Sequence, residues 1–319
     1  MLELTDDATA LRSRQAPSDV VMVRPVAFHV NPLSADDNPF QARVLDRDPR
    51  EVAASAYREV TDLVQALRSH GVTVRLFEDS SENFPDSVFP NNWFSTHHDG
   101  RVVLYPMYCP NRRGERRSDV VDQLRDTYEV TDVVDYSGLE SQGAFLEGTG
   151  AMVLDHLERT AYIARSNRAD EDTARRFCQD LGYEPIVFST ADVRGIPIYH
   201  TNVMMSVGTD IAMVGLDAVT DAAERATVHR RLTASGRTVI ELTHEQIDNF
   251  AGNVIELQGA EGPMLALSQR AYDSLQQAQR DVIELHVTLL PVPVPTIELS
   301  GGSVRCMIAG IHLPKRSAG

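Results

Sequence analysis

The stretch WFSTHHDGRVVLY, from Trp93 to Tyr105, holds an Asp-Gly pair between two runs of β-branched and aromatic residues. This pattern predicts a β-hairpin with a tight turn at the Asp-Gly pair. Three later stretches also place polar or glycine turn residues between two apolar runs, and each is a hairpin candidate: AMVLDHLERTAYIA (Ala151–Ala164), VMMSVGTDIAMVG (Val203–Gly215) and VIELQGAEGPMLAL (Val254–Leu267). The hairpins recur about every 50 to 60 residues, which is the size of a structural repeat.

Helical patterns follow these hairpins, at Ser118–Thr127, Asp170–Leu181, Ala218–Ser235 and Ser268–Ile283. Before the first hairpin, a strand at Val20–Val30, a helix at Asp48–His70 and a strand at Val72–Glu78 are predicted. A partial fifth hairpin, at Thr296–Gly310, would pair with the N-terminal strand. A repeated strand–strand–helix–strand unit predicts one closed α/β domain. The alternative is an ordinary mixed α/β sheet whose hairpins are only superficially alike.

Length and charge limit the function classes. The chain has 319 residues and a formal charge of −16, so nucleic acid and anionic membranes are not expected partners. Residues 1–18 are predicted to be a flexible tail without signal-peptide character, and residues 19–319 to be a single domain. The three cysteines are too few and too scattered for a disulfide framework, which predicts a reducing, cytoplasmic location.

Two segments carry candidate catalytic side chains. Cys306 follows the Gly301–Gly302 pair, and a cysteine presented beside a glycine turn suits nucleophilic catalysis. The alternative is a small buried hydrophobic residue. His200 and Asn202 are two residues apart at the start of a predicted hairpin strand, so their side chains should point to the same side. A general base beside a hydrogen-bonding partner is a plausible catalytic pair.

Further polar residues precede the other hairpins. Glu147 lies among apolar residues and glycines, where a buried carboxylate requires a partner. Asp86, Asn91 and Asn92 lie in a loop that is stiffened by two prolines and leads into a strand. Such residues usually cap turns, but they also line pockets at the end of a sheet.

Together, five segments resemble the guanidino-group-modifying enzymes of the pentein superfamily. They are FPDSVFPNNW, LEGTGAMVLD, ARSNRAD, YHTNVMM and SGGSVRCM, in an order and spacing that match that family. Ala169 stands where the family usually has Thr. The resemblance runs from Met22 to Pro314 and implies a five-bladed α/β propeller with a central active site. It also implies catalysis without a metal or an organic cofactor.

The resemblance also implies residue roles. Cys306 would be the nucleophile and His200 the general acid and base. Glu147 and Asn92, the latter paired with Asn91, would bind the reacting end of the substrate, and Asp86 its amino group. Arg168 matches the family's carboxylate-binding arginine, a role that suits the planar guanidinium.

Two departures from the family pattern bear on the substrate. Asn92 stands where many guanidinium-binding members have a carboxylate, and Asn202 replaces the Asp of their His-x-Asp motif. Both changes remove negative charge, and an amide can donate to a ureido C=O. We therefore expect a hydrolase of non-peptide C–N bonds that converts citrulline to ornithine, carbon dioxide and ammonia, as the most similar members do.

The alternatives are an arginine deiminase, an arginine dihydrolase, a dimethylarginine hydrolase, an amidinotransferase and a metabolite-binding pentein without activity. Since Cys306, His200 and Glu147 are all present, an enzyme is the favoured interpretation. The expected partner is a small amino-acid substrate. Assembly into a homo-oligomer is left open.

Overall fold

The computed structural model describes residues 14–35, 37–42, 47–79, 81 and 83–316. Most of the predicted tail, residues 1–13, lies outside this part, and its flexibility stays a prediction. Gln15, at the start of the described residues, is fixed to the propeller because its side-chain amide donates to the Leu154 and Val207 carbonyls.

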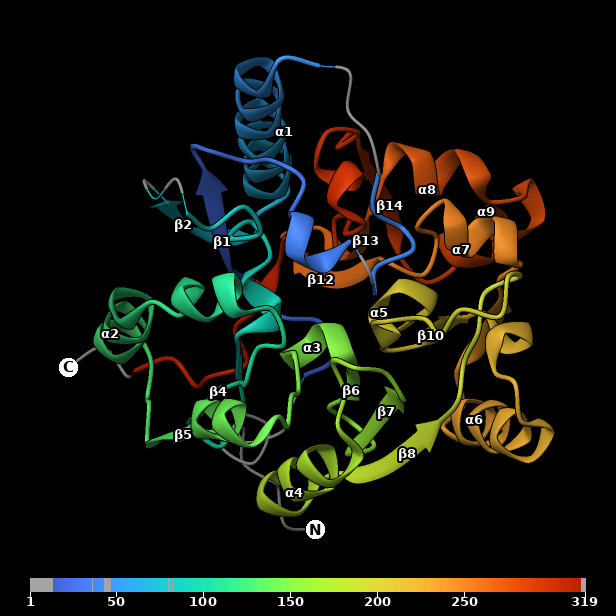
Figure 1. The fold of residues 1–319 in the computed structure, drawn as a ribbon. Coiled ribbons are helices and arrows are strands. Elements are labelled where there is room, and N and C mark those ends of the chain that lie inside the picture. The colour runs from blue at the N-terminus through green and yellow to red at the C-terminus, as the bar shows by residue number, and fades with distance from the viewer. Residues whose placement is uncertain (1–13, 36, 43–46, 80, 82, 317–319) are drawn as a thin grey trace, which may run out of the picture.

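Five three-stranded sheets surround a central axis, as Figure 1 shows. In chain order the strands are β1 (Asp19–Pro25), β2 (Thr73–Asp79), β3 (Phe94–Thr96), β4 (Arg101–Leu104), β5 (Asp132–Asp135), β6 (Met152–Asp155), β7 (Thr160–Ala164), β8 (Glu184–Phe188), β9 (Met205–Val207), β10 (Ile211–Val214), β11 (Thr238–Glu241), β12 (Ile255–Gly259), β13 (Gly262–Ser268), β14 (Thr288–Val292) and β15 (Ala309–Gly310). The sheet orders are β15-β1-β2, β3-β4-β5, β6-β7-β8, β11-β10-β9 and β12-β13-β14.

Every sheet repeats one topology. Its first strand pairs antiparallel with the middle strand, and the third strand returns parallel to the middle one. In the first blade the chain ends meet, because β15 pairs antiparallel with β1 through Val20 and Gly310. The predicted strand–strand–helix–strand unit, and its closure by the two chain ends, are therefore confirmed. The fold is the pentein α/β propeller.

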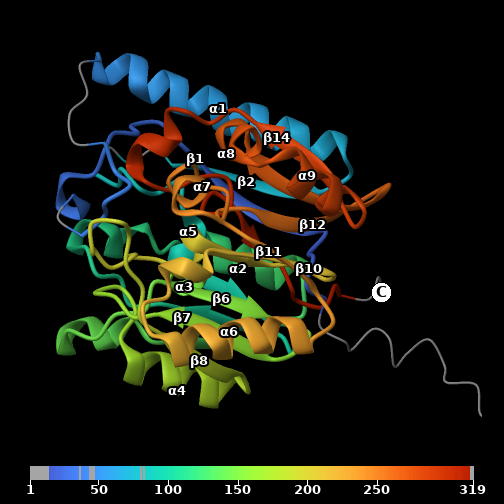
Figure 2. The ribbon, with the colours of Figure 1, turned by 90° about the vertical axis from the view of Figure 1, so that its right-hand side faces the viewer.

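Outer helices connect the second and third strands of the blades (Figure 1). They are α1 (Pro49–Ser69), α2 (Ser118–Thr127), α4 (Glu171–Leu181), α6 (Ala222–Ala234), α8 (Gln269–Ser274) and α9 (Gln277–Glu284). The predicted cap of α1 is present, since the Asp48 carboxylate accepts from the Arg50 N–H at 2.8 Å. At the end of α4, Gly182 adopts the left-handed conformation with φ 74°. Figure 2 shows α1 along one edge of the molecule and α4 and α6 at the opposite edge.

Two helix predictions were wrong in their bounds. The predicted helix Ala218–Ser235 begins only at Ala222, because Asp221 caps its first turn. The predicted helix Ser268–Ile283 is two helices, α8 and α9. Between them Gln276 and Gln279 form a reciprocal capping box that starts a new helix.

A third difference concerns the entry to the inner strands. Short helical turns, rather than strand, precede three of them: Pro90–Asn92, α3 (Gly148–Ala151) and α5 (Thr201–Met204). His200 and Asn202 therefore lie at the beginning of α5 and not on a strand. Cys306 also lies in an irregular turn ahead of β15. A further short α-helix is α7 (His244–Asp248), and further 3-10 helices span Pro32–Ser34, Pro110–Glu115, Ser137–Gln142, Leu216–Ala218 and Ile297–Ser300.

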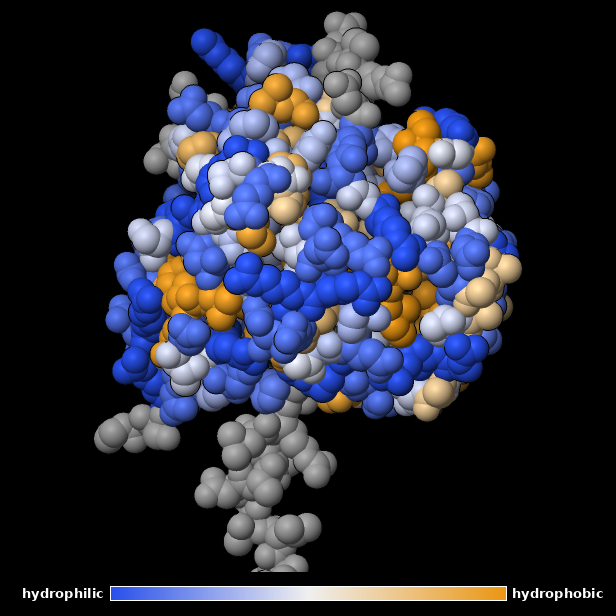
Figure 3. Space-filling view, turned by 60° about the horizontal axis from the view of Figure 1, so that its bottom comes forward, coloured by the Kyte–Doolittle hydropathy of each residue, from blue (hydrophilic) through white to orange (hydrophobic). Residues whose placement is uncertain are grey.

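The face shown in Figure 3 is mainly hydrophilic, with separate apolar patches. Within the described residues, no helix is both long enough and apolar enough to span a bilayer.

Candidate active site

Helical turns at the start of the inner strands bring the candidate residues together. In Figure 1, α3 and α5 lie side by side near the centre of the ring, and they are in contact. Gly150 allows this closeness: a Cβ atom there would lie 2.3 Å from Asn92 Nδ2 and 2.8 Å from His200 Nδ1. Such distances are shorter than side chains tolerate, so a glycine is required at this position.

Cys306 is buried and its sulfur accepts two amide hydrogen bonds. Asn253 Nδ2 lies 3.1 Å from Sγ, and Asn202 Nδ2 lies 3.3 Å from it. The Asn253 side-chain oxygen in turn accepts from the Ser303 N–H at 3.1 Å, which fixes the amide's orientation. Donors directed at sulfur favour negative charge on it, as a nucleophilic cysteine requires.

The other two cysteines are in a different environment. Cys109 and Cys178 are both buried, and burial raises the pKa of each thiol to about 12. A thiol that stays protonated at neutral pH is a poor nucleophile. Cys306 is therefore the chain's candidate nucleophile.

His200 and Glu147 form a buried pair. His200 Nε2 donates to Glu147 Oε2 at 2.9 Å, and Glu147 Oε1 accepts from the Tyr108 N–H at 3.0 Å. Burial lowers the pKa of His200, and the attraction of Glu147 only partly compensates. Burial also works against ionisation of Glu147, but the charge of Arg168 and the hydrogen bond from His200 outweigh it and lower the pKa of that carboxyl. The pair is thus a neutral imidazole beside a carboxylate that can stabilise its protonated form.

Arg112 places a guanidinium inside the site. Its Nη1 donates to Asn92 Oδ1 at 3.0 Å and lies 3.7 Å from Glu147 Oε2. The same side chain forms an ion pair with Glu115 at 2.9 Å and approaches Asp86 Oδ2 to 3.6 Å. Only 2% of the Arg112 side chain is exposed, so these carboxylates already have a buried internal cation.

Arg168 is also paired within the protein. Its Nε and Nη2 donate to the two carboxylate oxygens of Asp37 at 2.9 and 2.6 Å, and its Nη1 lies 3.3 Å from Glu147 Oε2. The guanidinium stacks over the Tyr199 ring, with its carbon 4.9 Å from the ring centroid. Burial disfavours the charge of Arg168, but Glu147 and Asp37 raise its pKa well above the usual value.

These side chains surround a small cavity, which we call the active cavity. It is lined by Ser34, Asn38, Asp86, Phe89, Asn92, Arg112, Arg168, Tyr199, His200, Ser300, Gly302 and Cys306. Only about 10 Å³ is open to the centre of a water molecule, room for about one water. An amino-acid substrate therefore needs some of these side chains to move.

The predicted site residues converge with one qualification. Asp86, Asn92, Arg168, His200 and Cys306 line the active cavity. Glu147 and Asn202 lie directly behind it. Glu147 is hydrogen-bonded to His200, and Asn202 is hydrogen-bonded to Cys306. Asn91 is fully buried and outside the lining. Its side-chain oxygen accepts from Asn92 Nδ2 at 3.1 Å, so it supports Asn92 rather than facing the cavity.

Sequence reasoning missed Arg112, Tyr199 and Asn253. For Asn253 a signal existed: Asn253-Val254 precedes β12 as Asn202-Val203 precedes β9. Superposing the repeats would have found it. Arg112 lies in the run NRRGERR, which has the composition of a solvated surface segment. Within the described ranges, no group of three or more His, Cys, Asp or Glu side chains is arranged to hold a metal ion.

Comparisons with known proteins bear on the family and the fold of the chain. The family model described as "N,N dimethylarginine dimethylhydrolase, eukaryotic" matches residues 24–313. No curated protein matches the chain.

Among solved structures, the apo arginine dihydrolase ArgZ from cyanobacteria is similar with a TM-score of 0.72 and 18% identity, over 93% of this chain and 41% of that one. This chain thus spans about two fifths of full-length ArgZ. A complex of AgrE with L-arginine gives 0.73 and 18%, over 93% of this chain and 40% of that one. The dimethylarginine hydrolase DDAH of Pseudomonas aeruginosa, in complex with citrulline, gives 0.60 and 15%, over 92% and 99%.

At these identities the solved structures establish the fold, and the family match establishes the family. The match spans nearly the whole propeller and includes the Glu147–His200 pair and Cys306. The chain therefore belongs to the N,N-dimethylarginine dimethylhydrolase family of the pentein superfamily, whose members are hydrolases acting on C–N bonds of guanidino groups.

Proposed function

We propose that this chain hydrolyses the ureido group of citrulline, with Cys306 as nucleophile, to give ornithine, carbon dioxide and ammonia. The observation that carries the proposal is the position of Arg112. Its guanidinium lies in the active cavity against Asn92 and close to Asp86 and Glu147, where a guanidinium substrate would need free carboxylates.

Charge supports a neutral reacting group. An arginine substrate would bring its guanidinium close to the Arg112 guanidinium, which already lies against Asn92 and Glu147. A ureido group is neutral and does not compete with Arg112 for these carboxylates, and its C=O can accept from arginine and asparagine donors.

The first step forms a bond between Cys306 sulfur and the ureido carbon. The thiol proton passes to the neutral imidazole of His200, and Glu147 stabilises the resulting imidazolium across its 2.9 Å hydrogen bond. The ureido C=O electrons move onto oxygen. The Asn92 side-chain amide, which donates to Asn91 in the free protein, can instead donate a hydrogen bond to this oxygen. Such a donor stabilises the transition state by on the order of 3 kcal/mol.

The second step releases ornithine. The C–N bond to its side chain breaks, His200 returns the proton to the leaving nitrogen, and Cys306 keeps an S-carbamoyl group. His200 then removes a proton from water, which attacks the carbamoyl carbon. The sulfur leaves and recovers a proton, and carbamate decomposes to ammonia and carbon dioxide. One water is consumed per citrulline.

Charged residues at the lining suit the amino-acid end of the substrate. Arg168 binds the α-carboxylate by exchanging Asp37 for it, since both are carboxylates held in the same bidentate geometry. Asp86 receives the α-amino group. We also place the chain in the cytoplasm, in keeping with its three unpaired cysteines.

Product analysis tests the proposal. Citrulline, arginine and N,N-dimethylarginine are each incubated with wild type and with Cys306→Ala, and ornithine, citrulline, ammonia and dimethylamine are measured. The proposal requires ornithine and ammonia in equal amounts from citrulline, at a higher kcat/KM than for the other substrates, and no product with the variant. A wild type inactive on citrulline contradicts it.

Arginine dihydrolysis is the second candidate, favoured by the similarity to ArgZ and to the arginine complex of AgrE. It yields two ammonia for each ornithine from arginine. The family match favours a third outcome, release of dimethylamine from dimethylarginine. Citrulline accumulating from arginine identifies a deiminase, transfer to an added amine identifies an amidinotransferase, and binding without turnover identifies a metabolite-binding protein.

A further inference from the structure

A second cavity lies on the propeller axis, beyond the helical turns that form the active site. We call it the axial cavity. Residues of the inner strand of every blade, β3, β6, β9, β12 and β15, line it. About 50 Å³ is open to the centres of water molecules, room for about four waters. This matches the four or five heavy atoms of a small oxyanion.

Arg305 supplies an unpaired cation to this cavity. Its side chain makes one hydrogen bond, from Nη1 to the Ile308 carbonyl at 2.9 Å, and no carboxylate of the described residues pairs with it. Burial lowers the pKa of Arg305 to about 10, so the group remains positively charged at neutral pH. A partly buried cation without a carboxylate partner favours an anion beside it.

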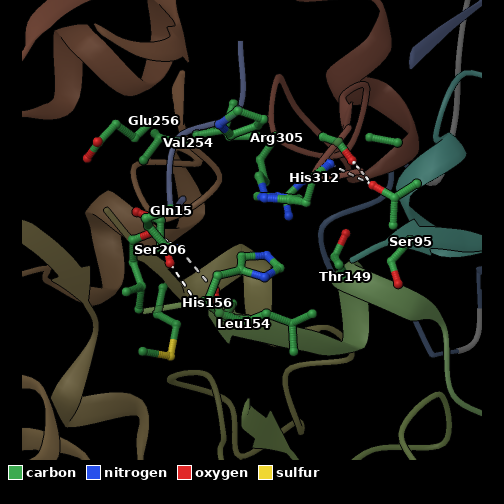
Figure 4. A pocket seen from close by; sticks show the side chains of 18 of the residues that line it. Gln15, Ser95, Thr149, Leu154, His156, Ser206, Val254, Glu256, Arg305 and His312 are labelled. Carbon is green, nitrogen blue, oxygen red and sulfur yellow. Dashed lines mark hydrogen bonds between the residues drawn. The ribbon is translucent and has the colours of Figure 1, made fainter. Parts of the chain in front are cut away.

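The one carboxylate in the lining is engaged elsewhere. Glu256 accepts from the Thr209 N–H at 2.8 Å and from the Thr209 hydroxyl at 2.6 Å. Figure 4 shows its carboxylate directed away from Arg305. The Glu256 carboxylate is therefore satisfied by Thr209 and does not pair with Arg305.

Histidines complete the donor set. The rings of His156 and His312 stack with centroids 3.8 Å apart, and both residues line the cavity. His156 Nδ1 bonds to the Tyr183 hydroxyl at 2.9 Å, and its Nε2 has no partner among the residues described. In Figure 4, His156 and Arg305 extend toward the same space from opposite sides.

We propose that the axial cavity is a binding site for a small inorganic oxyanion, of the size of bicarbonate or phosphate. The Arg305 guanidinium supplies the charge and the fork of donors that fits two oxygens of such an ion. His156 Nε2 supplies a further donor from the facing wall. The site differs from the active cavity, in which both arginines already have carboxylate partners.

Calorimetric titration of the full chain with bicarbonate, phosphate and sulfate, at constant ionic strength in chloride, tests the site. We expect one saturable oxyanion site per chain. Its affinity should fall at least tenfold in Arg305→Gln. It should be unchanged in the matched control Arg316→Gln, because the Arg316 side chain is exposed near the same chain end. Because Arg305 neighbours the nucleophile, binding and not activity is the readout.

A second variant and a second measurement keep the test decisive. Arg305→Lys retains the charge without the fork, and we expect intermediate affinity. A crystal soaked with selenate should show anomalous density between Arg305 and His156. Absence of saturable binding, equal affinity in Arg305→Gln, or selenate only at Arg112 and Arg168 would each overturn the proposal.

Discussion

The active cavity and the axial cavity lie on two sides of the same layer of helical turns. They differ in whether their arginine side chains have carboxylate partners. In the active cavity, Arg112 is paired with Glu115, and Arg168 with Asp37. In the axial cavity, Arg305 has no carboxylate partner within the described structure. Both are built by the same five-fold repeat, so the difference comes from side chains and not from the backbone.

The contrast shows how one turn serves two sites. Arg305 and Cys306 are neighbours in sequence, yet Arg305 lines the axial cavity and Cys306 the active cavity. Internal ion pairs leave the active cavity nearly closed and suited to a neutral reacting group. An unpaired cation leaves the axial cavity suited to an anion. If the two cavities are separate in function, a change at the nucleophile should leave the axial cavity unaffected.

The largest effect is expected from Cys306→Ala. Turnover should be lost completely, because no other thiol is placed at the lining, while the fold and oxyanion binding in the axial cavity should persist. Iodoacetamide should label Cys306 ahead of the buried Cys109 and Cys178, with protection by substrate. Mass spectrometry locates the label. Residual turnover of more than a few per cent would contradict covalent catalysis.

Glu147→Gln should lower kcat roughly a hundredfold, since the imidazolium of His200 would lose its carboxylate. The pH profile gives a sharper test. His200 must be neutral to accept the thiol proton, so activity should fall as pH drops through its pKa, which burial holds below 6.5. The Glu147 charge raises that pKa, so the variant's acidic limb should move to lower pH.

Glu261 is exposed, so Glu261→Gln is the matched control for this change. It should alter neither kcat nor the acidic limb of the pH profile. If Glu147→Gln keeps the wild-type limb, the titrating group is not His200. If kcat is unchanged as well, Glu147 has no part in orienting the imidazole.

Much of this architecture was predictable because each blade repeats a local pattern. The Asp99-Gly100 turn, the alternating apolar runs and caps such as Asp48 are short-range signals. The five-bladed closure followed from the repeat and from the family resemblance. The bounds of α8 and α9 were missed because a Gln–Gln capping box in an otherwise helical pattern looks like continuous helix.

The site was only partly predictable. Cys306, His200 and Glu147 stand in motifs, so the sequence identified them. The placement of His200 as the cap of α5 was missed, because a helix of four residues is too short for a helical period to show. The pairing of Arg112 with Asn92 and of Arg168 with Asp37 joins segments distant in sequence, and such contacts exist only once the blades close.

Asn92→Asp should separate the two candidate substrates. A carboxylate removes the amide donor and places negative charge against the ureido oxygen, a cost of about 2 kcal/mol or roughly thirtyfold in citrulline kcat/KM. Arginine kcat/KM should hold or rise, because a carboxylate–guanidinium contact is charge-assisted. Steady-state kinetics on both substrates measures the ratio. A parallel loss on both would mean that Asn92 acts only by holding Arg112 in place.

The smallest effect is expected from Asp37→Asn, and it tests the pairing of cations directly. In the free protein the Asp37 carboxylate occupies Arg168 in a bidentate contact, with N···O distances of 2.9 and 2.6 Å. A substrate carboxylate must displace it, and an asparagine, being neutral, competes less strongly for the guanidinium. KM for citrulline should therefore fall by a few-fold while kcat stays constant, and the exposed control Asp172→Asn should change neither. A decarboxylated analogue of citrulline should show no gain, since it has no carboxylate to exchange. A higher KM in Asp37→Asn would show instead that Asp37 orients Arg168 for the substrate, and the active cavity would then be preformed rather than opened by exchange of an ion pair.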